Sequence, residues 1–351
     1  MMTQHSGKDK RVRAWKKTRP PKRILAIRLH AIGDVVITLP YLQHLRNMLP
    51  SDTRLDLMTI EECAGIPQSL NLFDRVYVIG GGRNFKKQFT QAVLFLPQLL
   101  FRRYEVVLDL QDAVISRLVR KLIFPRAWTT FDRFSPIPAG MRTQQTMNAV
   151  GIGEIHINTG LALKSPVNTE SMLGQAGWFA GNDLVVLNPA GAFETRNWPL
   201  GNYVEFARGW KKIFPHTQFL VLGTENIAIK ADYFKSRLGE NLVNLVGKTT
   251  MAQAFALIQR VKLVLTEDSG LMHMAWVSGV ATFALFGSTR SDHARPLGDR
   301  SYFLDSSDLP CGSCMQELCK YGDTHCLSRY SPEMVLERAV ALVSGKICEI
   351  T

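Results

Sequence analysis

The stretch LVLTEDSGLMHMAWVSGVATFALFGST, residues 263–289, indicates the fold class of the whole chain. It contains an apolar strand, an acidic turn of small residues, a helix, a second apolar strand and a Gly-Ser-Thr turn. Strands that are apolar throughout and are joined by a helix are typical of parallel sheets covered on both faces. The stretch therefore predicts an α/β domain.

The same alternation extends over the rest of the chain. Further strands are predicted at Ile24–Leu29, Leu55–Ile60, Val76–Ile79, Val106–Leu110, Leu184–Leu187, Phe219–Leu222 and Leu242–Val246, besides Leu263–Thr266 and Thr282–Phe286. A chain of 351 residues exceeds what one hydrophobic core usually organises. We expect two Rossmann-like domains at residues 23–165 and 183–330, a basic disordered tail at 1–22 and a C-terminal helix at 331–351.

Composition restricts the class of protein. Hydrophobic residues make up 46% of the sequence and charged residues 21%, which is ordinary for a soluble globular protein. The apolar runs are too short to span a bilayer, and no signal-type segment precedes the first strand, so a cytoplasmic protein is predicted.

The net charge of +12 is concentrated in part in the N-terminal tail. Two interpretations of that tail stay open: a solvated leader without a role, and attraction to an anionic membrane surface. Specific nucleic-acid binding is a weaker third interpretation, because zinc-finger and RNP-type motifs are missing from the sequence.

The segment AIGDVVITLP, residues 31–40, follows the first predicted strand and contains Gly33 and Asp34. A carboxylate at the start of a helix often serves as a cap. At the mouth of a substrate cleft it also suits a general base, so both roles remain open for Asp34.

Two loops of the second half carry features that suit a nucleotide. In NPAGAFETRNWP, residues 188–199, Gly191 allows close backbone approach and Arg196 supplies a fixed charge for phosphate. In LGTEN, residues 222–226, Glu225 follows a strand, where acids bind ribose hydroxyls in dinucleotide folds.

The turn at the centre of residues 263–289 predicts an anion site. The amides of Ser269, Gly270 and Leu271 lie at a helix start, and Gly287 with Ser288 offers a second site nearby. Together they suit a pyrophosphate. The alternative is ordinary capping by Asp268 and Ser269.

In their order and spacing, these four segments resemble glycosyltransferase family 9, the ADP-heptose:lipopolysaccharide heptosyltransferases. The resemblance covers roughly residues 23 to 330. It implies the GT-B architecture, in which two Rossmann-like domains face each other across a cleft, and an inverting transfer of heptose from ADP-heptose to the inner core of lipopolysaccharide. The implied acceptor is a glycolipid of the lipid A-Kdo type, reached at the cytoplasmic face of the inner membrane.

By this resemblance Asp34 matches the family's proposed general base, and we assign Arg28 to the acceptor. Residues that match the donor site are Gly191, Arg196, Glu225, Asp268, Ser269, Gly270, Leu271, His273, Gly287 and Ser288. The family often has lysine where this chain has Arg196, which keeps the charge but changes its geometry. We assign no catalytic role to His273, which also suits a hydrogen-bonded, partly buried histidine.

Catalysis is expected to require no metal or other cofactor. The sequence contains no Asp-x-Asp triplet, the usual holder of a divalent ion in the other main glycosyltransferase architecture. Near the C-terminus, Cys311, Cys314, Cys319 and Cys326 lie within sixteen residues beside His325. This spacing leaves open a structural zinc site and a loop of unligated thiols.

Two other functions remain compatible with the sequence. A transferase of the same fold could use another nucleotide sugar, because fold does not determine the pocket. A catalytically silent nucleotide-sugar-binding protein is the second alternative, and the presence of Asp34 weighs against it. An epimerase is remote, because only one well-placed carboxylate is found.

Overall fold

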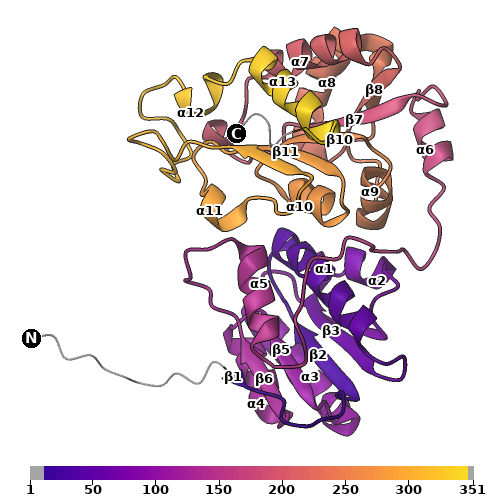
Figure 1. Ribbon diagram of the computed structural model, residues 1–351, viewed down its shortest axis with the longest axis vertical. Coiled ribbons are helices and arrows are strands. Elements are labelled where there is room, and N and C mark those ends of the chain that lie inside the picture. Colours follow the sequence, from indigo (N-terminus) through magenta and orange to yellow (C-terminus); the bar gives the residue numbers. More distant parts are fainter. Residues whose placement is uncertain (1–11, 347–351) are drawn as a thin grey trace, which may run out of the picture. The chain divides into compact units, whose positions relative to one another are not determined.

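The computed structural model describes residues 12–346, which form two α/β units (Figure 1). Unit 1 comprises residues 1–135 and 140–157, and unit 2 comprises residues 136–139 and 158–351. Each unit is built on its own largely parallel sheet, so the predicted α/β fold with two Rossmann-like domains is confirmed. The chain passes from unit 1 to unit 2 for the last time at residues 157 and 158, and the domain bounds 23–165 and 183–330 stay predictions.

Unit 1 contains a six-stranded sheet with the order β1-β6-β5-β2-β3-β4. Only β1 is antiparallel to its neighbour. The strands are β1 (Val12–Arg13), β2 (Arg23–Ile27), β3 (Arg54–Ile60), β4 (Arg75–Ile79), β5 (Val106–Asp109) and β6 (Ala127–Thr130). The four strands predicted here are confirmed, whereas β1 and β6 carry too few apolar residues to be predicted.

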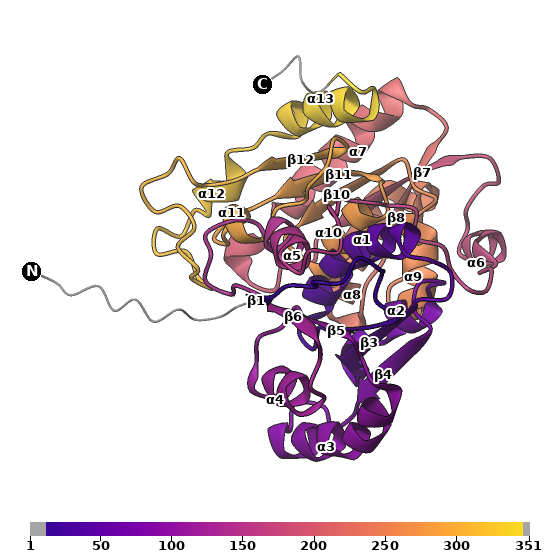
Figure 2. The same ribbon diagram turned by 60° about the horizontal axis from the view of Figure 1, so that its bottom comes forward.

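Helices cover both faces of this sheet, with α1 and α2 on one face and α3 and α4 on the other (Figure 2). Helix α1 follows β2 directly, so its first turn lies at the carboxyl edge of the sheet. The helices of this unit are α1 (Ile32–Met48), the 3₁₀ turn η1 (Glu61–Cys63), α2 (Gly65–Ser69), α3 (Phe85–Arg102), α4 (Val114–Leu122) and α5 (Ala139–Asn148).

Part of the predicted disordered tail packs on unit 1. Val12 pairs with Thr129, and the backbone N–H of Trp15 donates to the Val150 carbonyl at 2.8 Å. Arg19 forms an ion pair with Glu105, and this hydrogen bond lowers the pKa of Glu105 to about 2. Residues 12–22 are therefore fixed by pairing and charge, which a composition-based expectation of disorder does not register. Residues 1–11 lie outside the described part.

Unit 2 contains a six-stranded, entirely parallel sheet with the order β12-β11-β10-β7-β8-β9. Its strands are β7 (Asp183–Asn188), β8 (Thr217–Val221), β9 (Leu242–Asn244), β10 (Leu263–Glu267), β11 (Ala281–Leu285) and β12 (Ser301–Leu304). The five predicted strands are confirmed. Strand β12, which is only partly buried, was missed because it lacks a continuous apolar run.

The helices of unit 2 form two groups, with α7, α8 and α13 on one face of the sheet and α9 and α10 on the other (Figure 1). The first group encloses the main core, in which Trp198, Tyr203 and Trp210 are fully buried. The helical segments are α6 (Thr169–Gln175), η2 (Glu194–Arg196), α7 (Leu200–Ile213), η3 (Glu225–Ile227), α8 (Ala228–Leu238), η4 (Gly239–Asn241), α9 (Met251–Ile258), α10 (Gly270–Val277), α11 (Ser291–Ala294), α12 (His325–Ser328) and α13 (Pro332–Val343).

Among residues 12–346, no helix is both long enough and apolar enough to cross a membrane.

Candidate active site

The residues predicted to bind a donor follow neighbouring strands of the unit 2 sheet. Strands β11, β10, β7 and β8 lie side by side and are parallel, so their carboxyl ends share one edge. Gly191 and Arg196 follow β7, Glu225 follows β8, and the helix start at Ser269 follows β10. Ligands in open α/β sheets bind at this edge.

Arg196 and Asp268 form an ion pair that joins the loops after β7 and β10. The Arg196 Nη2 atom lies 3.0 Å from Asp268 Oδ2 and also donates to the Asp268 backbone carbonyl. The guanidinium lies 5.6 Å from the Phe193 ring centroid, and its buried Nε has no hydrogen-bond partner. The structure thus holds a cation at this edge and leaves one of its donors unused.

Helix α10 begins at this edge with Ser269 as its N-cap. The Ser269 hydroxyl accepts from the Met272 N–H at 3.3 Å and is itself bonded by the Asn188 amide at 2.8 Å. The amides of Gly270 and Leu271 lie in the first turn, where helical N–H groups lack partners within the helix. Ser269 therefore caps the helix, and the remaining amides of the turn are oriented as an anion site requires.

His273 lies one turn further along α10 and is buried. Its Nδ1 accepts a hydrogen bond from the Trp276 indole N–H at 3.1 Å. An accepting Nδ1 places the proton of a neutral imidazole on Nε2. This contact agrees with the hydrogen-bonded histidine considered from the sequence.

Glu267, which sequence reasoning missed, fixes the loop that carries Gly191 and Arg196. Its two carboxylate oxygens accept from the Gly191 N–H at 2.6 Å and from the Trp198 N–H at 2.7 Å, and the Tyr203 hydroxyl lies at 3.3 Å. Burial raises the pKa of Glu267 to about 7, although these hydrogen bonds and the charge of Lys230 oppose the shift. The sequence signal that could have found Glu267 was its place at the end of an apolar strand, because a buried acid there needs hydrogen-bond partners.

Glu225 lies against a glycine after the next strand. A Cβ at Gly247 would approach the Glu225 Oε1 to 1.7 Å, and Gly247 has a φ of +69°. Both the close approach and the left-handed backbone require glycine here. Gly247 therefore positions the exposed Glu225 side chain, and it was not predicted from the sequence.

Gly287 and Ser288 occupy a more enclosed place than the sequence suggests. The Ser288 N–H donates to the Thr195 carbonyl at 3.1 Å, and the two hydroxyls lie 2.9 Å apart. A Cβ at Gly287 would meet the same carbonyl at 2.1 Å. In this structure these residues join the β7 and β11 loops, and the Ser288 amide is already occupied. Their contact with a donor stays a prediction.

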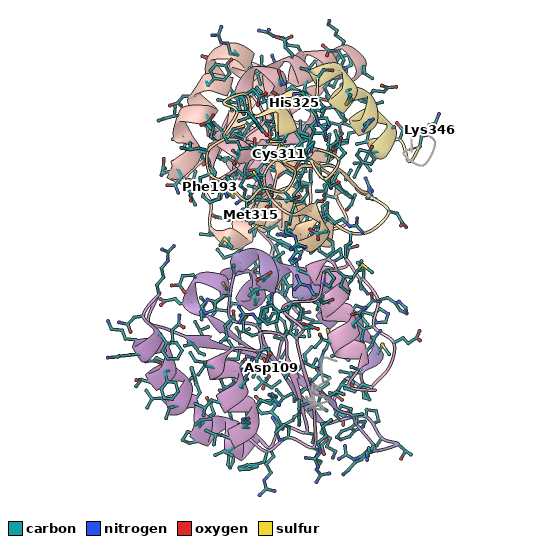
Figure 3. The ribbon with its side chains drawn as sticks, turned by 90° about the vertical axis from the view of Figure 1, so that its left-hand side faces the viewer. Asp109, Phe193, Cys311, Met315, His325 and Lys346 are labelled. Carbon is teal, nitrogen blue, oxygen red and sulfur yellow. The ribbon has the colours of Figure 1, made fainter. Side chains whose placement is uncertain are left out.

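The cysteine-rich segment packs beside this junction. Cys311, Cys314, Cys319 and Cys326 border a cavity of about 300 Å³ that Thr195 and Ser288 also line. Figure 3 labels Phe193, Cys311, Met315 and His325 in this part of unit 2. The Met315 N–H donates to the Ser288 carbonyl at 2.8 Å, so the segment supports the β11 loop.

The zinc site considered for these cysteines is not supported. Within residues 12–346, no group of three or more His, Cys, Asp or Glu side chains is arranged to hold a metal ion. Cys314 is exposed, and the Cys319 thiol donates to Asp323 at 3.7 Å. The thiols line a common cavity without converging on one point.

In unit 1, Arg28 and Asp34 meet where β2 leads into α1. The Arg28 Nη2 atom lies 3.0 Å from Asp34 Oδ2, which also accepts from the Ala31 N–H at 3.2 Å. The side chain of Asp34 is 41% exposed, whereas that of Arg28 is 5% exposed. Both contacts use Oδ2 and neither uses Oδ1. Asp34 is the third residue of α1, with Ala31 as the N-cap.

Arg28 is buried in unit 1, although its Nε has no hydrogen-bond partner. It donates to the Leu110 carbonyl, and its guanidinium lies 4.6 Å from the Phe131 ring centroid. Burial lowers the pKa of Arg28 from its ordinary value, and the charge of Asp34 opposes this. Arg28 therefore fixes Asp34 in this structure, and its assignment to the acceptor stays a prediction.

Gln111 holds the backbone just before α1, and Asp109 holds the turn that carries Gln111. The Gln111 Oε1 accepts from the Leu29 and His30 N–H groups at 3.0 and 3.1 Å, while Asp109 accepts from the Asp112 N–H at 2.8 Å. Asp109, labelled in Figure 3, lies at the end of β5 beside β2. The polar run after β5 was the sequence signal for this support.

Comparisons with known proteins agree with this geometry. The family model described as glycosyltransferase family 9 (heptosyltransferase) matches residues 159–325. The chain is 27% identical to lipooligosaccharide heptosyltransferase 2 of Campylobacter jejuni over 47% of the chain, and it spans about half (52%) of that relative. It is 22% identical to lipopolysaccharide heptosyltransferase 1 of Pseudomonas aeruginosa over 92% of the chain and 98% of the relative.

A solved structure shows the same fold. The Escherichia coli ADP-heptose lipopolysaccharide heptosyltransferase II aligns with a TM-score of 0.69 and 19% identity, over 92% of this chain and 98% of that chain. The sequence matches and the fold of the two Rossmann-like units thus agree with each other. The match to glycosyltransferase family 9 over residues 159–325, together with the relatives named above, supports the family that the motifs of this chain predict.

Proposed function

We propose that this protein is an inverting glycosyltransferase that moves a heptose from ADP-heptose to the inner core of lipopolysaccharide. The observation that carries the proposal is the unit 2 edge, where Arg196, Glu225 and the α10 helix start follow adjacent parallel strands. A basic side chain, a carboxylate and free helix amides match the phosphates and ribose of a nucleotide sugar. The family match supports the transferred sugar.

In the proposed reaction, Asp34 is the general base. Its Oδ1 takes the proton of an acceptor hydroxyl as the hydroxyl oxygen bonds to the anomeric carbon of the donor. The bond between that carbon and the diphosphate oxygen breaks, and ADP leaves with the electron pair. Arg196 and the amides of Gly270 and Leu271 stabilise the negative charge on the diphosphate.

We propose further that the donor contacts also include Gly191, Asp268, Ser269, His273, Gly287 and Ser288, and that Arg28 contributes to the acceptor side. The acceptor is a lipid A-Kdo type glycolipid, reached at the cytoplasmic face of the inner membrane with peripheral contact to anionic lipid. Cationic side chains and helix amides supply the charge stabilisation, so the reaction needs no divalent ion. Zinc is not part of the proposal.

Calorimetry with ADP-heptose, UDP-sugars and GDP-sugars tests the donor, followed by transfer assays with a Kdo-containing acceptor. We expect tight binding to ADP-heptose alone and a glycosylated lipid product. Preference for a UDP- or GDP-sugar would point to the alternative transferase. Donor binding without any product, at all acceptors tried, would favour a silent nucleotide-sugar-binding protein.

A further inference from the structure

Helix α3 of unit 1 exposes an unusual number of large apolar side chains. Its buried stripe is formed by Gln88, Ala92 and Leu99, which face the sheet. At 3.6 residues per turn, the exposed apolar residues fall in an arc of about half the helix circumference beside that stripe, with the exposed Lys86, Thr90 and Pro97 lying among them. The large apolar residues of this arc are Phe85, Phe89, Val93, Leu94, Leu100 and Phe101, with Leu94 66% and Phe101 88% exposed. So many large apolar side chains exposed on one helix mark an interaction surface.

All charged side chains of helices α3 and α4 are positive. The sequence of α3 contains Lys86, Lys87 and Arg102 and no acidic residue, and Arg103 follows it. Helix α4 packs against α3, contains no acidic residue either, and exposes Lys121 (Figure 2). Leu122 and Phe124 at the end of α4 add further exposed apolar area.

The lysines at the start of α3 work against the helix itself. Cations in the first turn oppose the helix dipole, which favours negative charge there. Asn84 already caps this end, because its side chain accepts from the Lys87 N–H at 3.1 Å. The placement of Lys86 and Lys87 therefore has a cost to local stability, which the carboxylate of Glu61, in the same pocket as both lysines, offsets in part.

We propose that this α3–α4 surface, formed by the exposed apolar arc and its flanking lysines and arginines, docks on a bilayer that contains anionic lipid. Exposed Phe and Leu bordered by Lys and Arg are the composition of helices that lie in the membrane interface. A second copy of this chain fits less well, because a two-fold contact would bring the same cations together and neither α3 nor α4 supplies an acid to pair them. The inference rests on the peripheral contact with anionic lipid in the proposed function and names the surface that makes this contact, and lipid binding itself requires neither donor nor acceptor.

Vesicle flotation of the full-length protein tests the surface directly. The probes are phosphatidylcholine vesicles with and without about one third phosphatidylglycerol, at low ionic strength where surface charges are weakly screened. We expect wild-type protein to float with the anionic vesicles and Leu94→Glu/Phe101→Glu to bind at least about tenfold more weakly. The matched control is Ile229→Glu on α8, equally exposed at 85%, which should bind as wild type.

A second variant, Lys86→Gln/Lys87→Gln, leaves the apolar arc intact and should lose the preference for anionic over neutral vesicles. It also keeps the test valid if the double glutamate variant does not fold, which melting curves will show. Removal of residues 1–11 should leave most of the binding in place.

Three results would overturn the inference: no flotation of wild-type protein, flotation of both double variants as strong as wild type, or binding that depends wholly on residues 1–11. Light scattering supplies a fourth. A wild-type oligomer that Leu94→Glu/Phe101→Glu dissolves into monomers would make this surface a contact between copies.

Discussion

The Arg28 guanidinium is buried beneath the exposed carboxylate of Asp34, with Nη2 and Oδ2 3.0 Å apart. Because of this pairing, Asp34 affects both the stability of unit 1 and the proposed reaction. Substituting Asp34 removes both the proposed base and the charge that neutralises a buried cation. A variant at Asp34 therefore needs a partner substitution before its loss of rate can be assigned to catalysis.

We expect Asp34→Asn to lower kcat by roughly 10²- to 10⁴-fold, the usual contribution of general base catalysis. It should also lower the melting temperature, by less than the loss of a fully buried pair would, because Asp34 is partly exposed. The double variant Arg28→Met/Asp34→Asn also removes the buried cation that the single variant leaves unpaired. It should recover much of the stability but not kcat. Recovery of turnover along with stability in the double variant would rule out the proposed base.

Arg196→Ala should raise the donor KM and also lower kcat, because charge on the diphosphate grows as the bond to the sugar breaks. Arg196→Lys is the matched variant, since it keeps the charge and loses the contacts of the planar guanidinium with Asp268. We expect intermediate values for it in steady-state kinetics. An unchanged donor KM in Arg196→Ala would mean that the nucleotide binds elsewhere.

Gly247→Ala should raise the donor KM as Glu225→Ala does, although residue 247 need not touch the donor. The added Cβ would lie 1.7 Å from the present position of Glu225 Oε1, so the carboxylate must move. Gly239→Ala is the control, because Gly239 also has a positive φ but has open space around its Cβ position. Both alanine variants should lose stability from backbone strain, by about 1–3 kcal/mol each, and only Gly247→Ala should weaken donor binding. Equal effects on KM would refute the positioning role of Gly247.

Glu267 predicts a pH dependence of stability in unit 2. Its pKa of about 7 lies above the ordinary value of 4.5, so its protonated form is favoured in the folded state. The contribution is fully present below about pH 4.5 and is lost as pH rises through about 7, by on the order of 3 kcal/mol. Urea unfolding of wild type and Glu267→Gln between pH 4.5 and 8 measures it. The wild-type free energy of unfolding should fall relative to the variant over this range, and parallel curves would contradict the prediction.

Turnover should persist in EDTA, because Arg196 and the α10 amides supply the positive charge that a divalent ion supplies elsewhere. Initial rates with and without EDTA, after exhaustive dialysis, provide the measurement. Activity that disappears and returns with magnesium or manganese would show that an ion participates.

The sequence predicted those parts of the molecule that follow from local pattern. Apolar runs such as Leu263–Thr266 gave the central strands, and turn residues such as Ser269 gave the helix start that follows. Residues whose role depends on a distant partner were missed. Glu267 has a buried place only because Gly191 and Trp198 turn their amides toward it, and Gly247 matters only because Glu225 lies over it. The burial of Arg28 likewise requires the Leu110 carbonyl and the Phe131 ring, which directly follow β5 and β6.

The hydroxyl of Thr195 has a consequence for protein engineering. It forms a hydrogen bond with the Ser288 hydroxyl and donates to the Gln316 carbonyl. The loop after β7, the loop after β11 and the cysteine-rich segment, which begin near residues 189, 287 and 306, are therefore joined at this one hydroxyl. Chimeras that exchange only the 188–199 loop with a relative would leave two of those segments without a fitting partner. Exchanges aimed at donor choice should therefore move all three segments as one cassette.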